Sequence, residues 1–292
     1  MSTSFRAIKK AVIPVGGLGT RLLPATKEQP KEMLPVFSGH HDQECLKPLV
    51  QLVYEQLFDF GLREFCFIVG RGKRVVEDHF VEDYGYVRIL TNRERTAAAR
   101  ELLGFYDRLR ESTIVWINQP EPKGFGDAVL RARPFVGDEA FLVHAGDTHI
   151  SSENQELLKR LLASHQRLGA DASIVVQEVE DPKQYGIVDL DECGIDEFRV
   201  KKAVEKPEKP FSKFAIMPIY VFSPIIFEAL AEASPGKDGE LQLTDGIQIL
   251  VNRGAGVYAV KMRETEIRLD IGTPQTYWHA LRQSWEYMRS KS

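Results

Sequence analysis

Three glycines and a group of cations follow one apolar run near the start of the chain. Residues 11–15 predict a buried strand, and Gly16, Gly17 and Gly19 come directly after it. Glycine lets the backbone approach a ligand closely, and the N–H groups of such a loop can point at phosphate oxygens whose charge Arg and Lys neutralise. The other polar residues of interest in this segment are Thr20, Arg21, Lys27 and Lys31. The segment therefore predicts a loop that binds a polyphosphate.

The spacing of this loop differs from that of two common phosphate-binding loops. A Walker A loop requires Gly-Lys-Ser/Thr, whereas Gly19 is followed by Thr20 and Arg21. A dinucleotide fingerprint requires a third glycine, which allows a helix to pack closely on the strand, and Leu22 occupies that place. Three prolines within residues 24–35 interrupt any helix that would begin here. We therefore expect a long ordered loop, and a dinucleotide-dependent oxidoreductase is disfavoured.

Two further polar residues follow predicted strands at the point where each strand ends. Gln119 follows the strand at 113–117, and its amide offers both a donor and an acceptor, as the edge of uracil or thymine requires. Asp147 follows the strand at 141–143, and a carboxylate at a strand end beside a triphosphate is an expected Mg²⁺ ligand. The structural alternatives are a surface glutamine in a turn and an N-cap for the next helix. Beside a phosphate loop, the functional interpretations are favoured.

The string GGLGTRLLPATKEQPKEMLP, residues 16–35, resembles the signature of the sugar-1-phosphate nucleotidyltransferases. Its PATK and PKEMLP portions are most similar to the bacterial and archaeal UTP–glucose-1-phosphate uridylyltransferases. A bare G-x-G-T-R is shared with thymidylyl-, adenylyl- and guanylyltransferases. The resemblance extends over about residues 7–280 and implies uridylyl transfer from UTP to glucose 1-phosphate, with UDP-glucose and pyrophosphate as products.

The resemblance also implies roles for individual residues, with Mg²⁺ as the cofactor. At the nucleotide these are Gly16, Gly17, Gly19, Thr20, Gln119 and Gly124; at the sugar they are Gly186, Glu205 and Lys206; at the metal they are Asp147 and Asp270. Glu205 and Lys206 belong to an E-K-P element, and Gly186 to a Y-G-x-V turn. The catalytic residues would be Arg21, Lys31 and Lys206. Because the sugar phosphate is already an anionic nucleophile, these cations would hold two mutually repelling anions in line for attack.

The chain departs from the uridylyltransferase pattern at two places. The element with the first metal carboxylate is usually Leu-Pro-Asp in that family, whereas Gly146-Asp147 looks more like the thymidylyl group. A glucose-1-phosphate thymidylyltransferase that uses dTTP is therefore an alternative, and a catalytically silent regulator that binds sugar nucleotides is another. Residues 38–46 look like an insertion. Their two adjacent histidines and two acids suggest a metal site, but a solvated loop is the favoured interpretation.

Strand-like and helical stretches alternate through the first half of the chain. Predicted strands lie at 11–15, 65–69, 113–117, 141–143 and 172–176, and predicted helices at 48–60, from 73, and at 91–110, 128–132 and 153–167. This alternation predicts a Rossmann-like α/β fold whose mixed, mainly parallel sheet carries helices on both faces.

From residue 183 the pattern changes to short β-rich pieces. These lie at 186–190, 197–204 and 214–222, and helices are predicted at 224–233, 243–252 and 274–289. We expect a mixed or antiparallel extension, an inserted β-rich part that binds the sugar. A single domain over residues 1–292 is predicted, with a nucleotide-binding part at about 7–150, a sugar-binding part at about 171–250 and a C-terminal helix at about 274–289.

Composition excludes several other classes of protein. The net charge of −4 and the pI near 6.0 give no general attraction to nucleic acid or to an anionic membrane. No apolar run approaches the roughly 20 residues that span a bilayer, and the first ten residues lack the apolar stretch of a signal peptide. Three widely spaced cysteines are typical of reduced thiols in a cytoplasmic protein. We expect a cytoplasmic homo-oligomer, a dimer or a tetramer, with small-molecule substrates.

Overall fold

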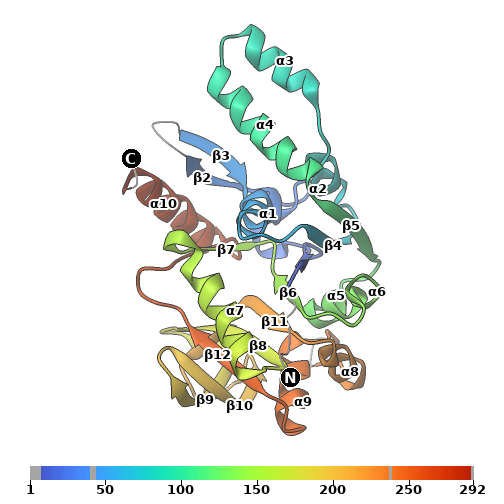
Figure 1. The fold of residues 1–292 in the computed structure, drawn as a ribbon, viewed down its shortest axis with the longest axis vertical. Helices are drawn as coiled ribbons and strands as arrows, with labels where there is room; N and C mark the ends of the chain where they lie inside the picture. Colours follow the sequence, from blue (N-terminus) through green and yellow to red (C-terminus); the bar gives the residue numbers. More distant parts are fainter. Residues whose placement is uncertain (1–7, 40–43, 237–238, 291–292) are drawn as a thin grey trace, which may run out of the picture.

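The computed structural model describes residues 8–39, 44–236 and 239–290. The strands of its main sheet are β1 (Lys10–Pro14), β4 (Glu64–Gly70), β5 (Thr113–Gln119), β6 (Phe141–His144), β8 (Ala172–Glu178), β9 (Gly186–Gly194), β10 (Glu197–Glu205), β11 (Phe214–Phe222) and β12 (Val257–Lys261). In the described chain they form one sheet in the order β5-β4-β1-β6-β11-β8-β12-β10-β9 (Figure 1). Two small antiparallel sheets pair β2 (Pro35–Gly39) with β3 (Glu44–Pro48), and β7 (Thr148–Ser151) with β13 (Ile267–Asp270).

Helices connect and cover these strands. The α-helices are α1 (Leu49–Asp59), α2 (Arg74–His79), α3 (Tyr84–Asn92), α4 (Thr96–Arg110), α5 (Phe125–Arg131), α6 (Arg133–Val136), α7 (Glu156–Leu168), α8 (Ile225–Glu232), α9 (Leu243–Asn252) and α10 (Pro274–Ser290). Four 3-10 turns are described: η1 (Thr20–Leu22), η2 (Lys31–Met33), η3 (Glu153–Gln155) and η4 (Pro182–Gln184). Within the described ranges, no helix has both the length and the apolar character of a membrane span.

The main sheet is mixed, as predicted, but it is not mainly parallel. Strands β5, β4, β1 and β6 are mutually parallel, and β8 is parallel to β12. Strand β11 is antiparallel to both β6 and β8, and β10 is antiparallel to both β12 and β9. Parallel neighbours require a long crossover, whereas β9 and β10 are joined by a tight turn that makes them antiparallel. The β-rich extension expected after residue 183 therefore continues the same sheet.

Alternation along the strands places a separate apolar core on each face of the sheet. On β1, Ala11 and Ile13 belong to one core and Val12 belongs to the other, as the two-residue period of a strand requires. Helices α1 and α7 contribute to the first core, and α5, α8 and α9 to the second. Helices thus cover both faces of the sheet. The run at 11–15 is continuously apolar because the strand β1 is buried on both sides.

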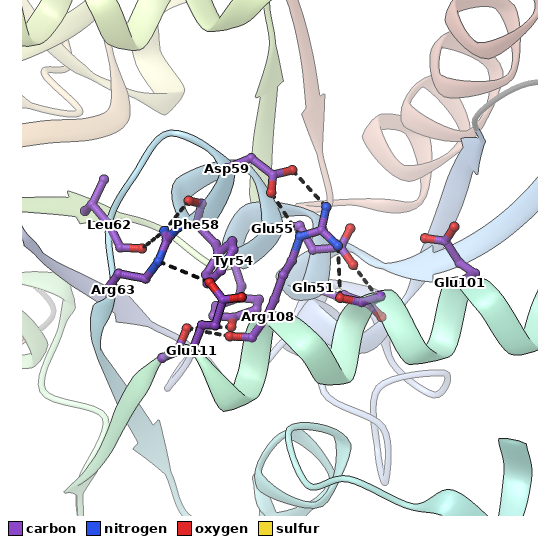
Figure 2. A network of polar contacts seen from close by, with 12 residues as sticks. Gln51, Tyr54, Glu55, Phe58, Asp59, Leu62, Arg63, Glu101, Arg108 and Glu111 are labelled. Atoms are coloured by element: carbon purple, nitrogen blue, oxygen red, sulfur yellow. Dashed lines mark hydrogen bonds and ion pairs between the residues drawn. The ribbon is translucent and has the colours of Figure 1, made fainter.

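Polar contacts fix the protruding helix α4 to α1 (Figure 2). The Arg108 guanidinium donates from Nε and Nη2 to the two carboxylate oxygens of Asp59, at 3.0 and 3.1 Å. Arg63 donates to the carbonyl of Phe58 at 2.7 Å and lies 3.7 Å above the centre of its ring. The bidentate geometry of the first pair makes it stronger than an ordinary surface ion pair. The last turn of α1 is therefore held against the last turns of α4.

The segment predicted as one helix at 91–110 is interrupted. Helix α3 ends at Asn92 and α4 begins at Thr96, because Glu94 adopts a φ of +58° that no α-helix accommodates. The helix α3 was not predicted as a separate element, since none of its side chains is buried. Strands β2, β3, β7, β12 and β13 were also not predicted.

The expected insertion at 38–46 contributes to the hairpin of β2 and β3. The paired histidines, His40 and His41, lie outside the described residues. The hairpin packs on α10: the rings of Phe37 and Trp285 have centroids 4.9 Å apart, and the Phe37 N–H donates to Ser284 Oγ at 3.2 Å. The C-terminal helix therefore covers this hairpin.

Candidate active site

One cavity lies at the carboxyl edge of the parallel strands β1, β5 and β6. Its volume is about 520 Å³. Ligands of open α/β sheets bind outside the carboxyl ends of the strands. All the residues that the sequence predicts for nucleotide, sugar, metal or catalysis line it: Gly16, Gly17, Gly19, Thr20, Arg21, Lys31, Gln119, Gly124, Asp147, Gly186, Glu205, Lys206 and Asp270. The fold thus brings together groups from distant parts of the chain, while the role of each stays a prediction.

The glycine loop is held close to the neighbouring strands. Its first residue, Val15, donates its N–H to the Ile68 carbonyl at 2.9 Å, which extends the pairing of β1 with β4. Gly19 has a φ of +64°, a conformation in which glycine avoids the Cβ clash of other residues. Thr26 Oγ1 then donates to the Gly19 carbonyl at 2.7 Å and closes the loop. As expected from its prolines, the segment contains only the 3-10 turns η1 and η2 rather than an α-helix.

Lys31 and Asp147 form an ion pair inside the cavity. Lys31 Nζ donates to Asp147 Oδ2 from the turn η2, and Asp147 follows β6. Burial alone would lower the pKa of Lys31, but the charges of Asp147 and Glu32 outweigh it and raise that pKa above its ordinary value. Burial alone would raise the pKa of Asp147, and the Lys31 charge outweighs it and lowers that pKa. Both groups are therefore charged at neutral pH.

Asp270 joins this pair from the end of β13. Strand β13 is antiparallel to β7, and Asp270 is opposite Thr148 in the register. Thr148 Oγ1 lies 3.3 Å from Asp270 Oδ1 and 3.5 Å from Asp147 Oδ1. Burial and the nearby Asp147 charge raise the pKa of Asp270. Two carboxylates that repel one another beside the glycine loop offer the hard oxygen donors that a divalent cation prefers.

Lys27 does not lie with Arg21 and Lys31, the other two cations of this segment. Its ammonium group pairs with Glu28 at 3.5 Å, and 76% of its side chain is exposed. It does not line the cavity. The backbone turn in which the Lys27 N–H donates to the Pro24 carbonyl leaves its side chain in solvent. Arg21 and Lys31 are thus the cations that this segment contributes to the cavity.

A buried ion pair behind Lys31 was not predicted from the sequence. Glu32 Oε2 lies 2.8 Å from Lys73 Nζ, with 2% and 8% of the two side chains exposed. Lys73 immediately precedes α2, and Glu32 lies beside Lys31 in η2. Charges of alternating sign therefore run from Lys73 through Glu32 and Lys31 to Asp147. The P-K-E-M string places Glu32 next to Lys31, but nothing in the sequence indicated that Lys73 is the partner of Glu32.

Glu205 and Lys206 form the opposite end of the cavity. Glu205 Oε2 accepts a hydrogen bond from Thr244 Oγ1 at 2.7 Å, which leaves Oε1 near Lys206 Nζ at 3.5 Å. Gly186 is paired with Glu205 in the sheet, and a Cβ at position 186 would lie 2.8 Å from Glu205 Oε2. Lys206 has a φ of +38°, an unusual conformation for a non-glycine residue and one found at functional sites.

Arg268 is a second cavity residue that the sequence reasoning missed. Its Nη2 donates to the Tyr185 hydroxyl at 3.0 Å, and both residues line the cavity. Arg268 precedes Asp270 by two residues on β13, and residues two apart on a strand share a face. Because β13 was not predicted, the two-residue spacing from Asp270 could not be used to identify Arg268 as a cavity residue.

Two buried histidines flank Asp147 without reaching the cavity. His144 Nδ1 lies 2.9 Å from the Ala145 carbonyl oxygen, and His149 Nε2 lies 3.1 Å from Ser151 Oγ. Burial lowers the pKa of His144 to about 4 and that of His149 to about 3. Both rings are therefore neutral near pH 7.

Comparison with known proteins shows the family of this chain. A family model described as nucleotidyl transferase matches residues 10–286. The chain belongs to the nucleotidyl transferase family. A UTP–glucose-1-phosphate uridylyltransferase of Pseudomonas aeruginosa is 36% identical over 278 residues, which are 94% of each chain.

Solved structures of this nucleotidyl transferase family have the same fold. A crystal structure of UDP-glucose pyrophosphorylase complexed with UDP-glucose matches with a TM-score of 0.82 and 29% identity, over 96% of this chain and 100% of that one. A UTP-bound UGPase from Acinetobacter baumannii matches with a TM-score of 0.82 and 28% identity, over 97% of this chain and 98% of that one. The mixed α/β architecture of the chain is therefore that of a nucleotidyl transferase.

Proposed function

We propose that this nucleotidyl transferase transfers the uridylyl group of UTP to glucose 1-phosphate, forming UDP-glucose and pyrophosphate. The observation that carries the proposal is that one cavity is lined by the glycine loop, the Gln119 amide, the carboxylates of Asp147 and Asp270 and the E-K-P element. The similar uridylyltransferase and the UDP-glucose and UTP complexes described above support this choice of substrates.

Binding of the two substrates would be divided between the ends of the cavity. The amides of the glycine loop and Arg21 would bind the β- and γ-phosphates, which leave as pyrophosphate. Glu205, oriented by its hydrogen bond from Thr244, would accept hydrogen bonds from glucose hydroxyls. Lys206 would pair with the sugar phosphate. We propose one domain, with a nucleotide-binding part at about 7–150, a sugar-binding part at about 171–250 and the helix at 274–289.

The reaction itself needs charge stabilisation rather than a strong base. An oxygen of the sugar phosphate attacks the α-phosphorus, a new P–O bond forms, and the bond to pyrophosphate breaks. Lys31, which its charged neighbours keep protonated, would neutralise the α-phosphate during this step. Preorganised charges of this kind typically contribute about 3–4 kcal/mol each to transition-state stabilisation.

A divalent cation, in our proposal Mg²⁺, fits the donor set of this site. Asp147 and Asp270 supply carboxylate oxygens, and Mg²⁺ is commonly held by one or two carboxylates together with substrate phosphates. Groups of three or more His, Cys, Asp or Glu side chains that could hold a metal are absent from the described residues, so phosphate oxygens would complete the coordination. When bound, the cation would neutralise phosphate charge as a Lewis acid.

The thymidylyltransferase alternative rested on Gly146-Asp147. A Cβ at position 146 would lie 2.5 Å from Val15 Cγ1, and the Gly146 N–H donates to the Pro14 carbonyl at 3.1 Å. Close packing against β1 therefore accounts for this glycine without reference to the base. The uridylyl assignment is the one we propose; a cytoplasmic location and a homo-oligomer, dimer or tetramer, stay predictions.

Pyrophosphate release tests the proposed function. The protein is incubated with UTP, glucose 1-phosphate and Mg²⁺, and the same assay is run with dTTP, with galactose 1-phosphate and with N-acetylglucosamine 1-phosphate. We expect the highest kcat/KM with UTP and glucose 1-phosphate. A higher kcat/KM with dTTP would establish the alternative, and no release with any pair would favour the silent regulator.

A further inference from the structure

The amide of Gln119 is held in one orientation by two acceptors. Gln119 ends strand β5 with 4% of its surface exposed. Its Nε2 donates to the Gly124 carbonyl oxygen at 3.1 Å and to Asp127 Oδ2 at 2.8 Å. An amide NH₂ has two hydrogens, and both are used here. The opposite orientation would place the amide oxygen against two acceptor oxygens, so chemistry alone fixes the amide as described.

The remaining polar atom of this side chain lies at the glycine loop. A Cβ at position 16 would lie 2.6 Å from Gln119 Oε1, which places this oxygen directly against Gly16. Both Gln119 and Gly16 line the cavity. Within the described part of the chain, Oε1 accepts no hydrogen bond. The amide therefore offers an acceptor, and not a donor, to a ligand in the cavity.

Asp127 is itself held in place by the next turn of α5. Arg131 Nε donates to Asp127 Oδ2 at 2.8 Å, and its Nη2 lies 3.4 Å from Oδ1. The Asp127 side chain is 14% exposed. Neither Asp127 nor Arg131 lines the cavity. These two residues therefore do not contact a ligand in the cavity directly, and the hydrogen bond to Gln119 connects Asp127 to a residue that does line it.

We infer that Asp127 is a positioning residue that selects the nucleobase by fixing the orientation of the Gln119 amide. The inference rests on the proposed function in one respect, that the base binds at Gln119. The N3–H of uracil or thymine donates to an acceptor such as Oε1. Cytosine has an acceptor at N3 instead, and the two lone pairs would repel. Asp127 thus excludes cytidine nucleotides and leaves the choice between uracil and thymine to other contacts.

Binding measurements without a sugar phosphate test this inference separately from catalysis. The dissociation constants of UTP and CTP are measured by calorimetry for the wild-type chain and for D127A, D127N and E121Q. D127A removes one acceptor and should reduce the preference for UTP over CTP by roughly tenfold to hundredfold, the contribution of a hydrogen bond to a charged group. D127N keeps an acceptor oxygen in the same place and should retain most of the preference.

The control E121Q removes a negative charge from the connection between β5 and α5, close in sequence to Asp127. Glu121 is exposed and pairs with Lys123 at 2.8 Å, away from Gln119. Its substitution should leave the UTP preference unchanged. Equal reduction in D127A and E121Q would overturn the inference, because the effect would then be one of charge alone.

The outcomes also distinguish this inference from the proposed function. Wild-type protein that prefers UTP to CTP but releases no pyrophosphate would contradict the proposed reaction and leave the inference standing. Wild-type protein that binds CTP as tightly as UTP would overturn the inference, whatever the assay of turnover gives. Circular dichroism spectra establish that each variant is folded. If D127A does not fold, the inference is tested by the preference of the wild type for UTP over CTP and by the persistence of this preference in D127N.

Discussion

Asp147 precedes β7 and Asp270 ends β13, far apart in the sequence, yet the Thr148 hydroxyl lies within 3.5 Å of a carboxylate oxygen of each. The antiparallel pairing of β7 with β13 produces this arrangement, because Asp270 is opposite Thr148. Two carboxylates held together in this way repel each other, and the raised pKa of Asp270 reflects burial and that repulsion. The pair is therefore poised to gain stability from a cation.

The first prediction concerns this carboxylate pair. Asp147→Ala should lower turnover by at least ~10²-fold, because one preorganised charge contact at a phosphoryl centre is lost. Asp270→Ala should raise the Mg²⁺ concentration needed for half-maximal rate. Pyrophosphate release over a Mg²⁺ titration measures both. Unchanged Mg²⁺ dependence in both variants would remove the pair from the metal site.

A second prediction separates the two lysines of the N-terminal segment. Lys31→Ala should lower kcat by at least ~10²-fold with the fold intact, since the α-phosphate would lose the ammonium group that we propose neutralises it. Lys27→Ala is the matched control: it removes the same charge a few residues away, from a side chain that is 76% exposed. Its kcat should stay close to that of the wild type. Near-normal turnover in K31A would exclude Lys31 from the mechanism.

The buried pair of Glu32 and Lys73 gives a third prediction, on stability. Glu32→Gln leaves the Lys73 ammonium group buried without its carboxylate and should cost about 3–5 kcal/mol of unfolding free energy. The double variant E32Q/K73M should cost less than the sum of the single variants. Urea denaturation of the four proteins completes the cycle. Additive effects would show that the two groups do not interact energetically.

A fourth prediction follows from the buried imidazole of His165, whose Nδ1 lies 3.0 Å from Ser173 Oγ. Burial lowers the pKa of His165 to about 4, from an ordinary value of 6.5. Above pH 6.5 the ring is neutral in both the folded and the unfolded chain. As the pH falls from 6.5 toward 4, the unfolded chain binds a proton that the folded chain does not, so stability is lost over this window.

The full effect of this one group is about 3 kcal/mol, since one pKa unit corresponds to about 1.4 kcal/mol. His165→Asn should therefore flatten the decline of unfolding free energy between pH 6.5 and pH 4, as measured by urea denaturation at several pH values. An identical slope in the variant and the wild type would refute the assignment.

Strands and helices with strong apolar patterns could be predicted from the sequence. The run at 11–15 became β1, and the apolar spacing at 48–60 became α1, because both segments bury most of their side chains. The short strand β13 was not predicted, since Arg268 and Asp270 interrupt its apolar residues. It forms because its partner β7 supplies the pairing, a tertiary effect that no local pattern carries.

The candidate site was predictable where a motif had a familiar chemical meaning. The glycine loop, Gln119 and Asp147 follow predicted strands, so their convergence at one edge could be inferred. The supporting ion pairs and hydrogen bonds could not be predicted. Asp127, the partner of Gln119, lies in α5, and Lys73, the partner of Glu32, precedes α2; the sequence does not specify where these helices are placed. Contacts between side chains distant in the chain were therefore the missing information.

The position of β11 between β6 and β8 has a mechanical consequence. Its hydrogen bonds to both neighbours join the strands that precede the glycine loop and Asp147 to the strand that ends at Glu205, in one unbroken sheet. A movement that separated the two ends of the cavity would break hydrogen bonds between neighbouring strands of the sheet. We therefore do not expect a hinge between the two ends. We therefore expect the sheet below the cavity to stay rigid, and the loops that surround the cavity to set the rates of substrate entry and product release.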